Sequence, residues 1–170
     1  VDFGEDDDPQ INFDAFERQA IQNLERLKSP YVVCRMFRIG GGHKLRDTFF
    51  GKADEILSPR WKRRYTATAK KLFDRIEEKG WSDRFIFEMY DEPYNKDIPV
   101  IQAAAQLLKD VNPDVKITFW GNTYDPRLYG LVTVWTSNYQ TYGHFMAQKR
   151  KAVGDQVWLY NPLSCYSIDR

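Results

Sequence analysis

Short apolar runs alternate along the chain with segments whose apolar residues recur at the helical period. The apolar and aromatic runs at 31–37, 84–90, 116–120, 131–135 and 156–160 predict β-strands. Helical spacing of apolar residues predicts helices at about 12–28, 58–79, 97–111 and 137–152. Ser58-Pro59 marks a helix start, because serine caps the first turn and proline fits at its first position.

This order of elements predicts the fold class. A helix follows most of the strands, and such crossover connections join parallel strands. The pattern fits an open doubly wound sheet or part of a closed (β/α)8 TIM barrel. Polar or aromatic residues end strand after strand, which favours the barrel, because an open sheet concentrates its ligands at one switch point instead. We expect an α/β chain that forms a single domain over residues 1–170.

The length of the chain bears on the barrel. A complete barrel typically takes about 250 residues, and this chain has 170. We therefore expect a fragment with about five of the eight strands of an incomplete barrel. Because such a fragment exposes unpaired strand edges, we expect the chain to be inactive when it is expressed alone.

Charge and composition exclude several other functions. The formal net charge is +1, and the basic residues between Arg60 and Lys71 alternate with apolar ones as on the exposed face of a helix, so we expect no nucleic-acid partner. The acidic run at 5–8 lacks EF-hand spacing and is interpreted as a solvated terminus. Cys34 and Cys165 form no metal-binding motif, and we predict no metal, no cofactor and no membrane span.

Asp91-Glu92-Pro93 is the sharpest chemical feature of the sequence. The two carboxyls follow directly on the most apolar predicted strand. Neighbouring side chains of a strand point to opposite faces, but both lean over the same edge where the strand breaks at a proline-containing turn. Two partly desolvated carboxyls this close do not both ionise normally, and an acid beside an anion is what glycoside cleavage requires. A solvated turn capped by Asp91 is the alternative.

Four segments of the chain resemble the family 123 glycoside hydrolases. The segment 81–93 (WSDRFIFEMYDEP) is similar to the catalytic strand of that family, and its Tyr-Asp-Glu-Pro block is the most specific part. The segment 157–165 (VWLYNPLSC), with 168–170, is similar to a late barrel strand and the loop after it. The segments 112–117 (NPDVKI) and 130–132 (GLV) lie at corresponding places, and the resemblance covers about residues 10–170.

The resemblance implies a retaining β-N-acetylgalactosaminidase with a glycan substrate and a secreted or periplasmic location. In such enzymes the 2-acetamido oxygen of the substrate attacks the anomeric carbon and forms an oxazolinium intermediate. By resemblance, Glu92 is the general acid/base, and Asp91 orients the acetamido N–H and stabilises its developing positive charge. Neighbouring carboxyls on one strand end are poorly placed to flank a glycosidic bond, and assistance by the substrate removes that difficulty.

Six further residues are candidate sugar contacts, and each has a structural alternative. Trp120 and Trp135 are expected either to form a wall of the acetamido pocket or to pack in the core. Tyr160 is expected either to donate to the acetamido oxygen or to be packed within its strand. Asn122 and Asn161 are candidate ligands of sugar hydroxyls. His43 lies in the glycine-rich loop after the first strand, and its side chain is expected either to contact the substrate or to be exposed to solvent.

Two other functions remain open at this level. A barrel that has lost activity would still hold glycans through its aromatic rim, and glycan binding without hydrolysis would indicate it. Another retaining glycosidase would pair Glu92 with a nucleophile outside residues 1–170, and a covalent glycosyl-enzyme would indicate it.

Overall fold

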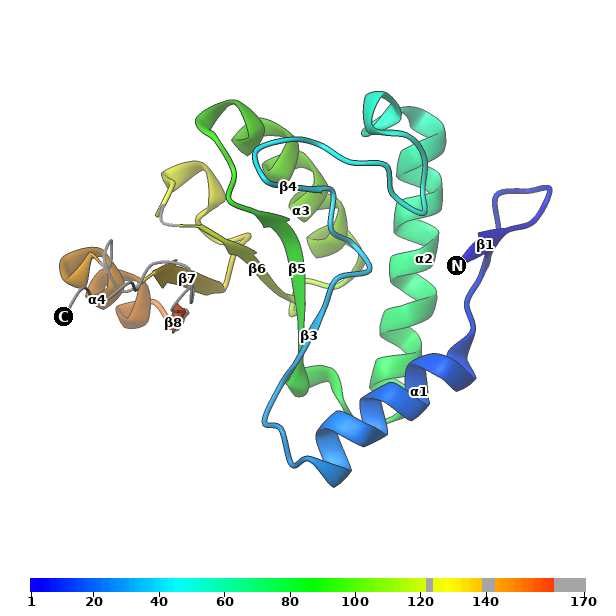
Figure 1. Ribbon diagram of the computed structural model, residues 1–170, viewed down its shortest axis with the longest axis horizontal. Coiled ribbons are helices and arrows are strands. Elements are labelled where there is room, and N and C mark those ends of the chain that lie inside the picture. The colour runs from blue at the N-terminus through cyan, green and yellow to red at the C-terminus, as the bar shows by residue number, and fades with distance from the viewer. Residues whose placement is uncertain (122–123, 139–142, 161–170) are drawn as a thin grey trace, which may run out of the picture.

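The fold is built on one mainly parallel β-sheet (Figure 1). The computed structural model describes residues 1–121, 124–138 and 143–160. Among these residues the sheet has six strands in the order β3-β5-β6-β7-β8, with β4 also paired to β5, and every pairing within it is parallel. Its strands are β3 (Val32–Cys34), β4 (Gly40–Gly41), β5 (Phe85–Asp91), β6 (Lys116–Trp120), β7 (Val134–Asn138) and β8 (Gln156–Tyr160). A separate antiparallel pair consists of β1 (Asp2–Phe3) and β2 (Pro9–Gln10).

The α-helices lie between and beside these strands. The Ser58 side chain accepts a hydrogen bond from the Trp61 N–H, with Pro59 at the first helical position, so the predicted helix start is confirmed. The same helix ends before Gly80, whose φ of 67° is the left-handed conformation that glycine adopts readily. No helix in the described ranges is both long and apolar enough to cross a membrane. The helices are α1 (Phe13–Ile21), continued by a π-helical turn (Gln22–Arg26), α2 (Pro59–Glu78), α3 (Ile98–Val111) and α4 (His144–Ala152), with 3-10 turns at Ala53–Glu55, Ser82–Arg84, Asn95–Asp97 and Pro126–Leu128.

The first predicted strand covers both a strand and a turn. β3 ends at Cys34, and the Arg38 N–H then donates to the Arg35 carbonyl. This turn brings Phe37 into the core, where its ring is fully buried among other aromatic rings. Its partners are Phe50, Tyr65, Phe73 and Phe87, with ring centroids 5.1 to 5.9 Å away. The apolar pattern therefore continues past the strand because the turn also fills the core.

β7 begins later than the sequence predicts. The N–H groups of Leu131 and Val132 both donate to the Leu128 carbonyl, so the start of this apolar run forms a turn. Because β7 then extends to Asn138, the predicted helix start at 137 is wrong, and α4 begins at His144. The predicted strands at 84–90, 116–120 and 156–160 agree with β5, β6 and β8 to within one residue.

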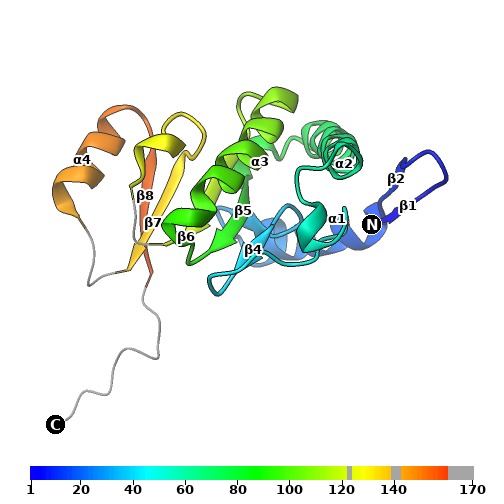
Figure 2. The same ribbon diagram turned by 90° about the horizontal axis from the view of Figure 1, so that it is seen from above.

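The helices cover one face of the sheet, and the sheet curves round the other. α2, α3 and α4 lie along the same side (Figure 2). On the opposite face the ring of Tyr31, just before β3, lies 5.4 Å from that of Trp158 in β8. β3 and β8 are the two edges of the sheet, and four strand spacings would hold them about 19 Å apart if the sheet were flat. The contact therefore requires strong curvature.

No closed barrel is seen in the part of the chain that the structure describes. β3 and β8 remain the edges of the sheet, and neither pairs with the other. The structure thus confirms a parallel α/β sheet with helices outside it. It does not show a barrel closed by eight strands in the described residues.

Candidate active site

A β-bulge at the end of β5 determines which of its side chains share a face. Glu88 is in register with Thr118 of β6 and Asp91 with Trp120, so three residue steps along β5 match two along β6. The extra residue interrupts the usual alternation of side chains. Glu88 and Asp91 therefore point to the same face, and Arg38 contacts both carboxylates.

Glu92 leaves the strand in a left-handed conformation. Its φ is 54°, which costs a residue with a Cβ about 1–2 kcal/mol. The Glu92 N–H donates to the Trp120 carbonyl at 2.6 Å, so the neighbouring strand holds this turn. The side chains of Asp91 and Glu92 are 42% and 56% exposed. Both carboxyls are therefore open to solvent at the C-terminal end of β5.

The loop after β3 folds back over this strand end. Gly40 and Gly41 form β4 in register with Tyr90 and Asp91, and the Gly42 N–H donates to the Asp91 carbonyl. A Cβ at Gly40 would lie 2.2 Å from the Tyr90 ring, so this close approach requires glycine. The glycine run is thus a short edge strand fastened to β5 beside the first carboxyl.

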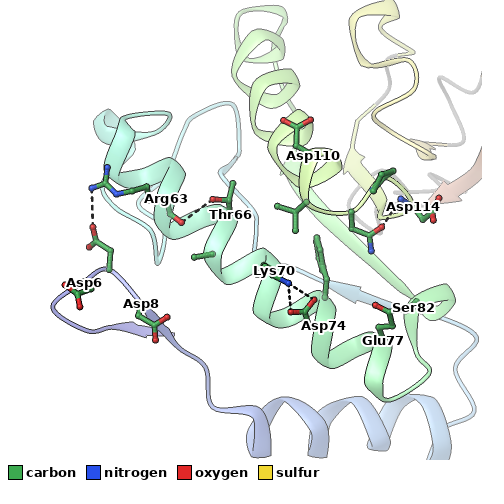
Figure 3. Close-up of a pocket in the computed structure, with 16 residues that line it drawn as sticks. Asp6, Asp8, Arg63, Thr66, Lys70, Asp74, Glu77, Ser82, Asp110 and Asp114 are labelled. Atoms are coloured by element: carbon green, nitrogen blue, oxygen red, sulfur yellow. Dashed lines mark hydrogen bonds and ion pairs between the residues drawn. The ribbon is translucent and has the colours of Figure 1, made fainter.

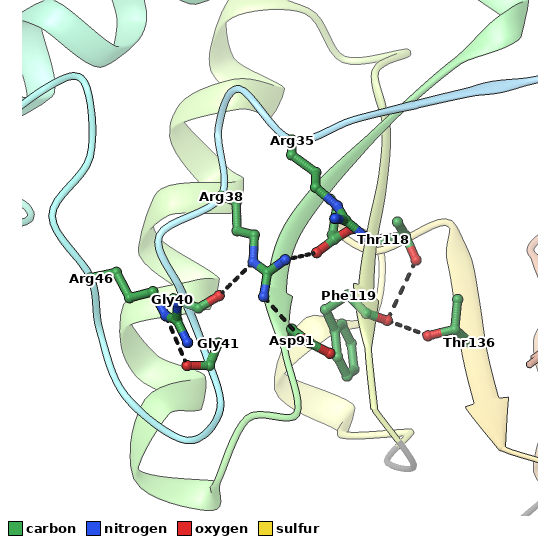
Figure 4. A network of polar contacts seen from close by, with 10 residues as sticks. Arg35, Arg38, Gly40, Gly41, Arg46, Asp91, Thr118, Phe119 and Thr136 are labelled. Atoms are coloured by element: carbon green, nitrogen blue, oxygen red, sulfur yellow. Dashed lines mark hydrogen bonds and ion pairs between the residues drawn. The ribbon is translucent and has the colours of Figure 1, made fainter. Parts of the chain in front are cut away.

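Arg38 connects this loop to two carboxylates (Figure 4). Its Nη2 lies 3.0 Å from Asp91 Oδ2 and its Nη1 lies 2.9 Å from Glu88 Oε1. Its Nε donates to the Gly40 carbonyl at 3.0 Å. The Glu88 side chain is fully buried, and its second oxygen accepts from Arg35 Nε at 2.8 Å. A buried carboxylate is costly unless it is paired, so the two arginines stabilise Glu88 in the sheet.

His43 lies beside the second carboxyl. Its ring stacks on that of Tyr94, with centroids 4.0 Å apart and planes inclined by 11°. Its Nε2 is 3.9 Å from Glu92 Oε2. One loop therefore faces both members of the pair, with the guanidinium of Arg38 at Asp91 and the imidazole of His43 at Glu92.

Comparison with known proteins identifies the family. The catalytic domain of glycoside hydrolase 123 matches residues 44–167. The chain belongs to glycoside hydrolase family 123. A solved family 123 glycoside hydrolase from Clostridium perfringens, described for glycolipid glycan hydrolysis, has a similar fold with a TM-score of 0.53 and 19% sequence identity. The match covers 66% of this chain and 21% of that enzyme, so the chain spans about a fifth of its length. No curated protein matches significantly.

The two sides of the candidate site differ in their relation to the family 123 domain. Asp91 and Glu92 lie inside the matched residues 44–167. Arg38 and His43 precede the first matched residue, although they contact the two carboxyls directly. The loop that faces the pair therefore comes from outside the matched range.

The two predicted tryptophans of this family 123 chain lie on different faces of the sheet. Trp120 ends β6, is in register with Asp91 and is half-buried on the same face. Trp135 is 1% exposed on the helix-covered face, where it stacks on Tyr124 and donates to Asp155 at 2.7 Å. The expectation that Trp135 forms a wall of a sugar pocket is corrected: it packs in the core.

The remaining sugar-contact predictions lie at the margin of the described chain. Tyr160 is the last residue of β8 and is in register with Asn138. Since β8 is parallel to β7 and every pairing from β5 to β8 is parallel, this backbone position is at the same end of the sheet as the end of β5. Asn122 and Asn161 lie outside the described residues.

Two residues of the site are missed by sequence reasoning. Glu88 has a recognisable signal, because a charged residue within an apolar strand is rarely buried without a partner. Arg38 has none, since it lies 53 positions from Asp91 in sequence. Only the folded arrangement of the loop over β5 brings the two together.

Two other ionisable groups near β5 are unsuited to act as anions at neutral pH. Burial raises the pKa of the Tyr90 phenol to about 12, and the Asp97 carboxylate adds to the rise. Burial raises the pKa of the Cys34 thiol to about 11. Neither side chain therefore competes with the carboxyl pair as a nucleophile or base.

A wide groove in the described part of this family 123 chain lies away from the pair (Figure 3). Its volume is about 1070 Å³, and it lies between α2, the end of α3 and the turn that joins β1 to β2. Side chains of both charges line it, including Lys70, Asp74 and Asp110. Within the described ranges no three histidine, cysteine, aspartate or glutamate side chains are grouped so as to hold a metal ion.

Proposed function

We propose that this chain supplies the catalytic carboxyls of a retaining β-N-acetylhexosaminidase. Glu92 is the general acid/base, and Asp91 orients the acetamido group of the substrate. The position of the pair supports this most strongly: adjacent carboxyls end β5, one facing a guanidinium and the other an imidazole, in a family 123 chain. The curved sheet is proposed to be part of a (β/α)8 barrel, whose site lies at the C-terminal strand ends.

The first chemical step forms an oxazolinium ring. The acetamido oxygen of the substrate attacks the anomeric carbon while the bond from that carbon to the leaving oxygen breaks. Glu92 gives its proton to the leaving oxygen, and the 56% exposure of its side chain supports this role. Two carboxyls side by side on one strand end do not flank a glycosidic bond, so the substrate itself supplies the nucleophile.

The second step returns the enzyme to its starting state. Water attacks the anomeric carbon, the Glu92 carboxylate accepts a proton from that water, and the bond from the anomeric carbon to the acetamido oxygen breaks. Two inversions at the same carbon give net retention of configuration. Throughout, the Asp91 carboxylate faces the nitrogen on which the positive charge develops.

The sugar is proposed to lie between the loop and β6. Trp120 shares the face of Asp91, and Tyr94 is 51% exposed and stacked on His43. Flat aromatic faces pack well against the apolar CH faces of sugars. Tyr160, Asn122 and Asn161 stay predicted contacts. The proposed substrate is a terminal β-linked N-acetylgalactosamine of a glycan, and the similar solved enzyme is described for glycolipid glycans.

The configuration of the first product tests the proposal. Proton NMR of an aryl β-N-acetylgalactosaminide treated with the full-length protein is expected to show the β-anomer first, with the α-anomer appearing only by later mutarotation. An α-anomer formed first would contradict retention. Glycan binding with no release would indicate a non-catalytic module, and a sugar trapped on a protein carboxyl would indicate a different retaining glycosidase.

A further inference from the structure

We propose that Arg38 is a positioning residue for Asp91 and that buried Glu88 is the anchor that holds Arg38 in place. The inference rests on the proposed function, in which Asp91 orients the acetamido group. It concerns the loop that precedes the residues matched by the family 123 domain.

The contacts of Arg38 fix the guanidinium in three directions. Nε donates to the Gly40 carbonyl, Nη1 faces Glu88 and Nη2 faces Asp91, at 3.0, 2.9 and 3.0 Å. The guanidinium is planar and its donors diverge at fixed angles. The contact with Glu88 Oε1 is an ion pair without a hydrogen bond, so the guanidinium is oriented by its hydrogen bonds to Gly40 and Asp91 and attracted to β5 by the buried charge of Glu88.

Glu88 makes the position of Arg38 hard to change. Its side chain is fully buried, and its other partner, Arg35, is 65% exposed. If Arg38 moved away, Glu88 would keep only a partner whose charge is screened by water, and a buried charge that loses its partner is strongly unfavourable. The buried carboxylate thus holds the guanidinium at β5 by its charge, in addition to the hydrogen bond that Asp91 accepts.

The sharing of one cation by two anions preserves the charge that the reaction needs. Arg35 also pairs with Glu88, so the cluster holds two guanidiniums and two carboxylates, but Arg35 is 65% exposed and water screens its charge. A guanidinium paired with Asp91 alone would cancel the carboxylate that faces the oxazolinium nitrogen. Because Glu88 takes part of that positive charge, Asp91 is oriented without losing its electrostatic role.

The two oxygens of Asp91 have separate uses in this arrangement. Oδ2 is held by Arg38. Oδ1 accepts no hydrogen bond from any residue that the structure describes, and the side chain is 42% exposed. Oδ1 is therefore the oxygen assigned to the acetamido N–H of the substrate.

Gly41 provides the space for this contact. A Cβ at Gly41 would lie 2.2 Å from Arg38 Nη2 and 3.1 Å from Asp91 Cβ. The backbone of Gly41 does not have a positive φ, so the absence of a side chain matters here for space and not for conformation. Gly41→Ala is therefore a variant that displaces the guanidinium and leaves every charge in place.

A double-mutant cycle tests whether Arg38 acts through Asp91. In the full-length protein, Arg38→Met is expected to lower kcat for an aryl β-N-acetylgalactosaminide by about 10- to 100-fold, with KM changed by less than about threefold. In the Asp91→Asn background the same change is expected to lower kcat by less than about twofold, because the negative charge that Arg38 positions is already lost. If Arg38→Met lowers kcat by the same factor in the Asp91→Asn background as in the native background, the inference is overturned.

Companion variants separate positioning from folding. Arg38→Met combined with Glu88→Gln removes both charges of the ion pair together, and is expected to unfold at a temperature near that of the native protein while keeping the low kcat. Gly41→Ala is expected to share that kinetic loss. Two control variants are expected to keep kcat within about twofold of the native value. Arg35→Met removes the other partner of Glu88, and Gly4→Ala adds a Cβ that meets nothing closer than 4.0 Å.

The outcomes distinguish this inference from the proposed function. If Asp91→Asn keeps the native kcat, the proposed role of Asp91 fails and the inference fails with it. If Asp91→Asn is slow but Gly41→Ala and the charge-free pair are as fast as the native protein, the proposed function stands and Arg38 is only structural.

Discussion

Glu92→Gln in the full-length protein is expected to lower kcat/KM for a β-N-acetylgalactosaminide with an alkyl aglycone by about 10³-fold, within the usual range of about 10²–10⁴ for a general acid/base. The amide keeps the shape of the acid but neither donates the proton to the leaving oxygen nor accepts one from water. Glu25→Gln, on an exposed position of the π-helical turn, is the matched control and is expected to leave the rate unchanged. Steady-state release of the sugar measures both.

The loss in Glu92→Gln is expected to depend on the leaving group. A dinitrophenolate leaves without being protonated, so kcat/KM for that aglycone is expected to fall by less than about tenfold. A fall in kcat/KM of the same size for both aglycones would contradict the assignment of Glu92 as the acid. An unchanged kcat/KM for the alkyl aglycone would show that Glu92 has no part in catalysis.

Asp91→Asn is expected to lower kcat for acetamido substrates by about 10²–10³-fold, the loss typical of removing one preorganised electrostatic contact to a transition state. Asparagine keeps the shape of the side chain, and its amide oxygen still accepts from Arg38, but it lacks the negative charge that faces the oxazolinium nitrogen. Asp83→Asn is the control, because that fully exposed carboxyl lies just before the other end of the same strand. A kcat for Asp91→Asn within about threefold of native would contradict the assigned role.

The elements that position the pair follow from local patterns. The Ser58-Pro59 cap and the apolar spacing after it predict α2, because capping and helical periodicity depend on neighbouring residues. The apolar run before Asp91 predicts β5 to within one residue, and with it the placement of Asp91 and Glu92 at a C-terminal strand end. These features need no knowledge of which strand lies beside which.

The rest depends on contacts between residues far apart in sequence. Alternation counted along β5 alone puts Glu88 and Asp91 on opposite faces, and the pairing with β6 introduces the bulge that brings them together. Trp120 and Trp135 look alike in sequence as aromatic ends of predicted strands. Their faces differ because Trp135 belongs to the interior of a strand that begins later, in register with buried Phe119. Neither the bulge nor that register is visible in the local pattern.

The most direct test of substrate assistance compares two sugars that differ only at carbon 2. The account predicts that the full-length protein hydrolyses an aryl β-N-acetylgalactosaminide at least about 10³-fold faster, in kcat/KM, than the matching 2-hydroxyl galactoside, because only the first carries its own well-placed nucleophile. Equal values of kcat/KM for the two sugars would contradict the account.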